Sequence, residues 1–217
     1  MRFVRMILFS LVLSNSWAED PAPSLPKLPD EAATAVNEGV LYFKDSKFKD
    51  AEDSFRKVTE LAPNHPVGWV NLGSVEYRLG EMDKAADHLK RGVMLDPTAQ
   101  QAWLTLGIIE YQKEDLEAGL AALSQAVYRD PKDPKAHLYL GILIRKKGWL
   151  SGAEDEMRKA IELDETYAEA HYNLAVLCLE QQPPAVELAR RHYFQALRLG
   201  AKPDPELDRT FKKTTAD

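Results

Sequence analysis

The stretch WVNLGSVEY at residues 69–77 decides the fold, because a close copy of it, WLTLGIIEY, occupies residues 103–111. The two copies lie 34 residues apart, and the same register continues along most of the chain. Successive units run 32–65, 66–99, 100–133 and 134–167, and a fifth unit, 168–201, carries two extra residues around Pro183-Pro184. The eighth residue of each unit is small: Gly39, Gly73, Gly107, Gly141 and Ala175. This spacing predicts an array of repeated structural units.

The second half of each unit has a pattern of its own. Twelve residues after the eighth stands another small residue, and a large apolar residue follows four places later. These pairs are Ala51 and Phe55, Ala85 and Leu89, Gly119 and Leu123, and Ala153 and Met157. Small residues let two helices approach closely, so each unit is predicted to be a helix pair. Pro63, Pro97 and Pro131 are expected to follow the ends of the second helices, and Gly80 and Gly148 suit the turns between paired helices.

The combined pattern resembles the tetratricopeptide repeat (TPR), whose signature is Trp-x2-Leu-Gly-x2-Tyr, then Ala-x3-Phe, then Pro. The resemblance covers residues 32 to about 201, although Tyr77 and Tyr111 stand one place later than the signature tyrosine. It implies an all-α, right-handed solenoid of about five helix-turn-helix repeats. Residues 202–217 are predicted to form a capping helix and tail, in which Leu207 and Phe211 cover the apolar face of the last pair.

Two segments of different composition precede the first unit. Residues 1–18 have a basic start, a short apolar run and small residues at the end, which predicts a secretory signal peptide cleaved before Glu19. An uncleaved anchor is the alternative, although the apolar run is shorter than the roughly 20 residues that span a bilayer. Residues 19–31 are rich in proline and are predicted to be an extended linker. We therefore expect an exported protein, periplasmic in a Gram-negative bacterium or secreted, with no stable membrane insertion after cleavage.

The charge of the chain argues against one class of partner, and its cysteine content argues against stabilisation by disulfides. The formal net charge is −6 and both signs are interspersed, which argues against nucleic acid as a partner because such binding relies on basic residues that neutralise phosphates. Cys178 is the only cysteine, so no internal disulfide is expected, and its apolar surroundings predict a buried thiol.

Nothing in the sequence indicates catalysis. The five histidines never stand three or four residues apart, so no one-face helical metal pair is present, and His137 and His171 occupy the place of the signature tryptophan, as packing residues. No phosphate loop and no nucleophile elbow occurs. We therefore expect no enzyme activity, no catalytic residue, no metal site and no cofactor.

The resemblance implies that the first helices line a concave groove, the usual binding surface of this family. Counting along each unit, the second, fifth, ninth and twelfth residues are predicted to face it. The candidate groove residues are Val36, Val40, Phe43, Val70, Ser74, Tyr77, Leu104, Ile108, Tyr111, Leu138, Ile142, Arg145, Tyr172 and Val176. A largely apolar groove favours an apolar or amphipathic segment as ligand, because soluble proteins seldom expose large apolar patches without a use for them.

Two alternatives for these residues remain open at the level of sequence. The curvature of the array buries them, or the proline-rich segment of the same chain covers them. Some family members clamp acidic chain ends with Lys, Asn and Arg, and this chain offers Asn37, Asn71 and Asn173 at the sixth place of three units, but the other clamp positions are apolar. Lys135 belongs to a basic spot in the fourth unit for which a solvated helix end is a sufficient explanation.

The function expected from these features is a non-enzymatic protein-interaction scaffold that binds a peptide or helical segment in its concave groove. The alternative is an architectural, self-associating component of an envelope assembly such as a secretion, pilus or cell-wall complex. The expected partner is a protein or peptide, and the formation of a homo-oligomer is left open.

Overall fold

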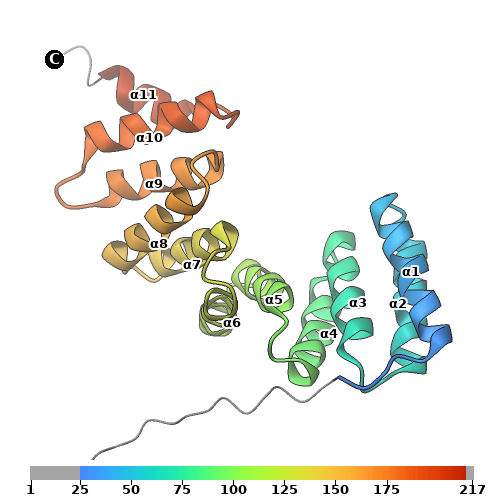
Figure 1. The fold of residues 1–217 in the computed structure, drawn as a ribbon. Helices are drawn as coiled ribbons and strands as arrows, with labels where there is room; N and C mark the ends of the chain where they lie inside the picture. The colour runs from blue at the N-terminus through green and yellow to red at the C-terminus, as the bar shows by residue number, and fades with distance from the viewer. Residues whose placement is uncertain (1–24, 214–217) are drawn as a thin grey trace, which may run out of the picture.

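The computed structural model describes residues 25–213, which form eleven α-helices and no β-strand in that part of the chain (Figure 1). The predicted signal peptide, residues 19–24 of the predicted linker and the last four residues lie outside the described residues. The helices are α1 (Asp30–Lys44), α2 (Phe48–Leu61), α3 (Pro66–Leu79), α4 (Met82–Leu95), α5 (Gln100–Gln112), α6 (Leu116–Arg129), α7 (Pro134–Lys146), α8 (Leu150–Leu163), α9 (Ala168–Glu180), α10 (Val186–Arg198) and α11 (Pro205–Lys213).

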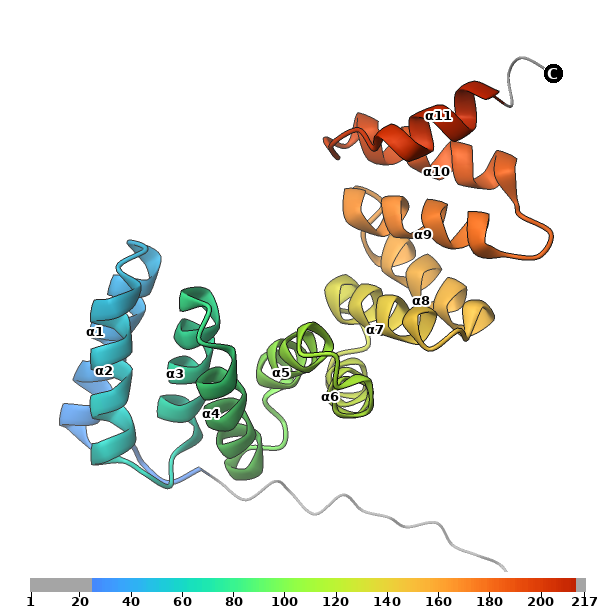
Figure 2. The ribbon, with the colours of Figure 1, turned by 180° about the vertical axis from the view of Figure 1, so that it is seen from behind.

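The helices stack as five successive antiparallel pairs, followed by α11. Figures 1 and 2 show that the pairs follow an arc, with the first helices of the pairs toward its inner side and α2, α4, α6 and α8 toward its outer side. Each pair contacts its sequence neighbours, so the core is continuous along the array and no unit buries its apolar face alone. The all-α solenoid expected from the sequence is therefore confirmed.

Proline and glycine define many of the helix ends. Pro66 and Pro134 are the first residues of α3 and α7, where the missing N–H costs no hydrogen bond. Gly80 and Gly148 follow the first helices of their pairs with φ of 80° and 82°, a left-handed conformation that glycine adopts without strain. Helix α1 begins at Asp30, two residues before the first unit predicted from the repeat register.

Close approach within each pair depends on the small residues of the repeat. A Cβ atom at Gly73 would lie 2.9 Å from the carbonyl oxygen of Ala85 and 2.7 Å from Cγ of Leu89, so the backbones of α3 and α4 are too close for any side chain there. Leu89 is fully buried against this glycine. The small-residue positions of the repeat are therefore the points at which paired helices touch.

From the second unit to the fifth, a ring N–H at the fourth place ties each unit to the one before it. The indole Nε1 of Trp69 donates to the carbonyl oxygen of Pro63 at 2.8 Å, and Trp103 makes the same bond to Pro97 at 2.9 Å. In the next two units the bonds come from Nε2 of His137, to Pro131 at 3.0 Å, and from Nε2 of His171, to Glu165 at 3.2 Å. Both imidazoles are buried, so they replace the tryptophans in packing and in hydrogen bonding.

Helix α11 closes the C-terminal end of the array. Leu207 and Phe211 are buried, and the Phe211 ring lies 5.5 Å from the ring of Tyr193 on α10. The Tyr193 hydroxyl donates to Asp208 at 2.7 Å and accepts from the backbone N–H of Asp204 at 2.8 Å. The helix thus covers an apolar surface that a further repeat would otherwise cover.

Cys178 is fully buried and burial raises the pKa of its thiol, which agrees with a packing role. Among the helices of residues 25–213, none combines the length and the apolar character that crossing a membrane requires.

Candidate functional site

A cavity of about 620 Å³ opens on the concave side of the N-terminal half of the array. It crosses four successive units, because its lining comes mainly from the first helices α1, α3, α5 and α7. The lining residues are Val40, Phe43, Lys44, Phe55, Asn71, Ser74, Tyr77, Arg78, Gln101, Thr105 and Lys135. We call this cavity the concave pocket.

Four of the predicted groove residues line the concave pocket: Val40, Phe43, Ser74 and Tyr77. Val40 is 37% exposed, and the rings of Phe43 and Tyr77 are half-buried. These side chains give the pocket an apolar and aromatic wall contributed by α1 and α3. In the first two units, these predicted groove residues therefore lie together on one face.

In the central units the structure places the predicted residues in the core. Leu104, Ile108, Leu138 and Ile142 are between 0% and 8% exposed, so they offer no surface to a partner. Val36 and Val70 are partly buried against core clusters, and Tyr111 packs against the clusters on both sides of it. Leu104 and Leu138 belong to core clusters that join each of these units to the next one. Self-burial, one of the two alternatives open in the sequence, is the outcome for these positions.

At the C-terminal units, contacts within the chain cross the concave side, and a separate cavity of about 560 Å³ lies between Tyr172 on α9 and residues 199–205. Arg145 on α7 pairs with Glu180 on α9 at 3.0 Å. The Tyr172 hydroxyl donates to the carboxylate of Asp204 at 2.7 Å, which together with burial raises the pKa of this tyrosine to about 12. Val176 packs into the C-terminal core cluster. The predicted groove therefore does not continue as an open cavity along the whole array.

Six first-helix residues of the concave pocket are not among the candidate groove residues, although Gln101 and Lys135 hold the second place, which is predicted to face the groove: Lys44, Asn71, Arg78, Gln101, Thr105 and Lys135. They stand at the second, sixth and thirteenth places of their units, which together with the ninth place form one stripe along a helix. That stripe is largely polar in the second and third units, which is the signal that would have located them. The prediction followed the apolar residues, and several of those are core residues.

The polar groups of the concave pocket fall into two classes. The hydroxyls of Ser74 and Thr105 donate to carbonyl oxygens one turn earlier in their own helices, at 2.7 and 2.9 Å. By contrast, the side chains of Lys44, Arg78 and Lys135 form no ion pair with any residue of the described range 25–213. The Arg78 guanidinium lies 5.8 Å from the centre of the Phe48 ring, and the Lys135 ammonium lies 5.8 Å from that of Tyr139.

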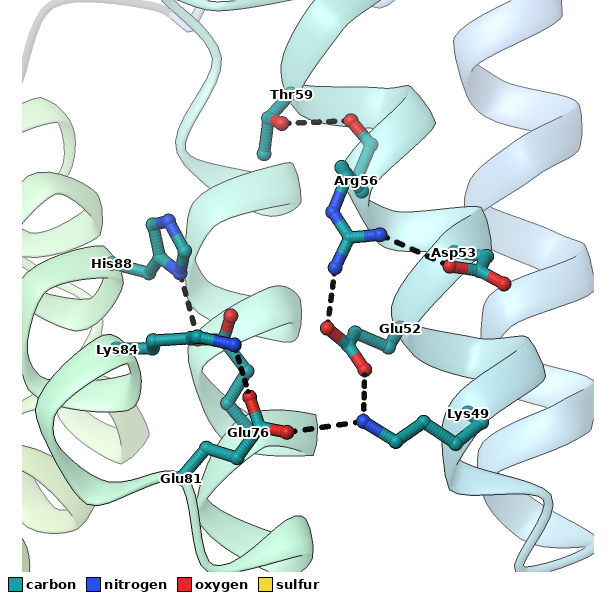
Figure 3. Close-up of polar contacts among 9 residues, drawn as sticks. All are labelled: Lys49, Glu52, Asp53, Arg56, Thr59, Glu76, Glu81, Lys84 and His88. Carbon is teal, nitrogen blue, oxygen red and sulfur yellow. Dashed lines mark hydrogen bonds and ion pairs between the residues drawn. The ribbon is translucent and has the colours of Figure 1, made fainter.

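A second polar cluster lies where α2 packs on α3 and α4, away from the concave pocket (Figure 3). The ammonium of Lys49 contacts Glu52 and Glu81 at 3.0 Å each, and Lys84 contacts Glu81 at 2.7 Å. These two lysines lower the pKa of the Glu81 carboxyl to about 2. Carboxylate oxygens of Glu52, Glu76 and Glu81 lie within 4.8 Å of one another, a spacing that suits a metal ion.

The charges in this cluster are already compensated. His88 contacts Glu76 at 2.7 Å, and Arg56 pairs with Glu52. Lys49 bridges the carboxylates of Glu52 and Glu81. Among the described residues, this is the one group with metal-ligand spacing, and its ammonium groups stand where a cation would bind. The cluster therefore ties the first two units together, and no metal or catalytic role follows from it.

The repeat register, the helix pairs and the ring N–H bonds between units define a TPR solenoid. More specifically, the chain belongs to the family described as "Cilia and flagella-associated protein 70 C-terminal domain", which it matches over residues 22–209. None of the curated proteins matches the sequence.

Several solved structures share the fold. MamA of Desulfovibrio magneticus RS-1 is 19% identical, with a TM-score of 0.71 over 85% of this chain and 98% of that one. YrrB, described as "a TPR protein with an unusual peptide-binding site", is 21% identical, with a TM-score of 0.69 over 84% of this chain and 92% of that one. PilF of Pseudomonas aeruginosa is 16% identical, with a TM-score of 0.70 over 80% of this chain and 78% of that one. At these identities the likeness concerns the fold.

Proposed function

We propose that this protein is an exported, non-enzymatic interaction scaffold that holds a peptide segment of another protein in the concave pocket. The observation that carries the proposal is the pocket itself, which combines the apolar wall of Val40, Phe43 and Tyr77 with polar groups from α3, α5 and α7. Pockets of this kind bind by burying apolar anchors, while the polar groups fix the orientation of the ligand. The described peptide-binding site of YrrB is a precedent for such a function on this fold.

The size and place of the pocket favour an elongated ligand. Because the lining crosses four units, a ligand that fills the pocket contacts several repeats at once. An extended or helical segment meets this condition better than a compact small molecule, since repeat arrays present long surfaces rather than enclosed cavities.

Export is tested first, because it decides which partners the protein meets. The full-length gene is expressed in a Gram-negative host, and the mature N-terminus is read by mass spectrometry of the periplasmic fraction. We expect a chain that starts at Glu19. A full-length chain retained in the membrane fraction would favour the uncleaved anchor, and a full-length soluble chain would show that residues 1–18 are not a signal.

Binding is tested with the processed protein and a displayed library of random peptides. Val40→Trp fills the concave pocket with an indole, whereas Leu41→Trp adds the same indole to the neighbouring residue, which is 60% exposed and lies outside the pocket. We expect the wild type and the Leu41 variant to enrich a common set of peptides and the Val40 variant to lose it. Equal enrichment by both variants would refute the concave pocket as the binding site.

A further inference from the structure

The lining of the concave pocket has a charge opposite to that of the whole chain. The chain carries a formal net charge of −6, yet none of the lining residues is acidic and three of them, Lys44, Arg78 and Lys135, are cations. Neighbouring charges in a pocket add their fields, so this surface attracts anionic groups even on an acidic protein.

The three cations are free to meet a ligand. Inter-unit cations elsewhere on the array are paired, as in Lys146 with Glu114 at 3.0 Å and Lys113 with Asp83 at 2.7 Å. The pocket cations have no such acidic partner within residues 25–213. All three residues are exposed, so a ligand that supplies carboxylates can form charge-assisted hydrogen bonds with them.

Two uncharged donors of the same wall are also without a partner in the described range. The side-chain amide of Asn71 and the hydroxyl of Tyr77 form no hydrogen bond with any residue there, and both side chains are half-buried. Half-buried donors are normally satisfied by protein, water or ligand. The pocket therefore presents a group of unsatisfied donors together with its positive charge.

Within its own helix, the Lys135 ammonium lies 5.8 Å from the centre of the Tyr139 ring and has no acidic partner. Lys44 and Arg78 lie in the last turns of α1 and α3, where the helix dipole favours a cation. Lys135 follows Pro134 in the first turn of α7, where the same dipole disfavours a cation. Its place in the lining of the pocket is a second reason for a cation at this position.

The placement of the cations also bears on how many acidic groups the ligand carries. Lys44 and Arg78 hold the thirteenth place of their units and Lys135 holds the second, an offset that corresponds to about 16 Å along a helix. A single carboxylate cannot engage cations at both ends of the first helices. The distribution favours a segment in which several acidic side chains are spaced along the chain.

We propose that the concave pocket selects an extended peptide with at least two acidic side chains that flank an apolar residue. This inference rests on the proposed peptide-binding function and adds the chemistry of the ligand. The apolar residue packs against Val40, Phe43 and Tyr77, and its acidic neighbours pair with Lys44 and Arg78 on one side and with Lys135 on the other.

The test uses the full processed protein and two synthetic peptides with blocked ends, so that neither offers a terminal carboxylate. One peptide alternates Glu, Leu and Ser, and the other has Gln in place of every Glu. Fluorescence anisotropy should give an affinity for the acidic peptide at least about tenfold higher at low salt. Raising the salt from about 50 to about 500 mM should remove most of this preference. If the Gln peptide binds equally well and Val40→Trp abolishes that binding, the pocket binds peptides but the acidic selectivity is wrong.

A matched pair of variants distinguishes binding in the concave pocket from general attraction between the acidic peptide and the charge of the protein. One protein combines Lys44→Glu, Arg78→Glu and Lys135→Glu, and the control applies the same change of charge at exposed cations outside the pocket, Arg91, Lys132 and Arg209. The pocket variant should lose at least about tenfold in affinity for the acidic peptide, and the control less than about threefold. Equal losses would overturn the proposal, and a failure of both peptides to bind the wild type would overturn it together with the proposed function.

Lys135→Glu alone guards against a folding artefact. Because an acid in the first turn of α7 suits the helix dipole, this variant should raise the melting temperature while it weakens binding of the acidic peptide. Weaker binding with a lower melting temperature would point to a damaged fold, and unchanged binding would remove Lys135 from the proposed site.

Discussion

Replacing His192 by Glu should change how the stability of the array responds to acid. In the wild type, Nδ1 of His192 lies 2.9 Å from Nδ1 of His171, and the two rings stack with centroids 5.1 Å apart. Since Nε2 of His171 donates to the carbonyl of Glu165, its Nδ1 is the acceptor when the pair is neutral. When both rings are protonated, two N–H groups face each other and this hydrogen bond is lost.

The structure gives the sign and the size of the effect. Burial, the charge of His171, and the nearby Arg158 and Arg191 lower the pKa of His192 from 6.5 to about 4, while Glu154 opposes them. A histidine whose pKa is lowered by folding contributes its full stability at pH values above its pKa in the unfolded chain. That contribution is lost as the pH falls from 6.5 toward 4. The difference corresponds to roughly 3 kcal/mol for a fully buried ring, and solvent screening of this half-buried one reduces it to on the order of 1–2 kcal/mol.

The preceding unit shows what the substitution creates. There Glu156 stands at the place of His192, and its carboxylate lies 2.6 Å from Nδ1 of His137, which raises the pKa of that histidine. His192→Glu should therefore give His171 an acidic partner, and the stability lost by the wild type between pH 7 and pH 4 should fall by about 1–2 kcal/mol. The reciprocal change, Glu156→His, should increase that loss.

Urea unfolding followed by circular dichroism at a series of pH values measures how the free energy of unfolding depends on pH. Because repeat arrays unfold in steps, the midpoint of the transition that reports the C-terminal units is the quantity to compare. The same dependence on pH in the wild type and in His192→Glu would refute the assignment of acid sensitivity to this pair.

Three further predictions concern packing and assembly. Gly73→Ala should destabilise the fold by about 1–3 kcal/mol, because the new Cβ meets the carbonyl oxygen of Ala85 at 2.9 Å, and thermal melting would detect it; an unchanged melting temperature would mean that the helix pair relaxes freely. Phe211→Ala should cost about 3–5 kcal/mol at the C-terminal end, since the ring is buried against Tyr193, and hydrogen exchange should show the loss in α10 and α11 but not in α1. Light scattering of the processed protein should show a mass that does not depend on concentration, and a mass that rises with concentration would favour the self-associating alternative.

Much of the fold could be predicted from residues whose effect on the backbone or on helix packing is local. The prolines and the glycines at 80 and 148 act on the backbone of their own turn, so their positions indicate helix ends without knowledge of the rest of the chain. Gly73 and Ala85 are equally direct, because only small residues fit where two helices touch. Because the same residue types recur every 34 residues, each of these local features supports the same prediction several times.

The extent of the binding surface could not be predicted in the same way. Whether Leu104 and Leu138 face solvent depends on the rotation between one unit and the next, and the register specifies only the order within a unit. The partner of Tyr172 is Asp204, which lies beyond the last repeat, so no pattern inside the repeat predicts this contact. Lys135 holds the second place, which the register predicts to face the groove, but its sharing of one pocket with residues of α1 and α3 depends on the assembled array.

The ring N–H bonds between units have a consequence for how such an array changes its length. The acceptor is a backbone carbonyl, which every residue provides, and the donor is either an indole, as in Trp103, or an imidazole, as in His137. A duplicated 34-residue segment therefore brings its own donor and finds an acceptor at the end of whatever unit precedes it. Units can therefore be gained or exchanged by recombination without a compensating change in the neighbouring unit. The two terminal units have a neighbouring unit on one side only, so the ends of the array need α1 and α11.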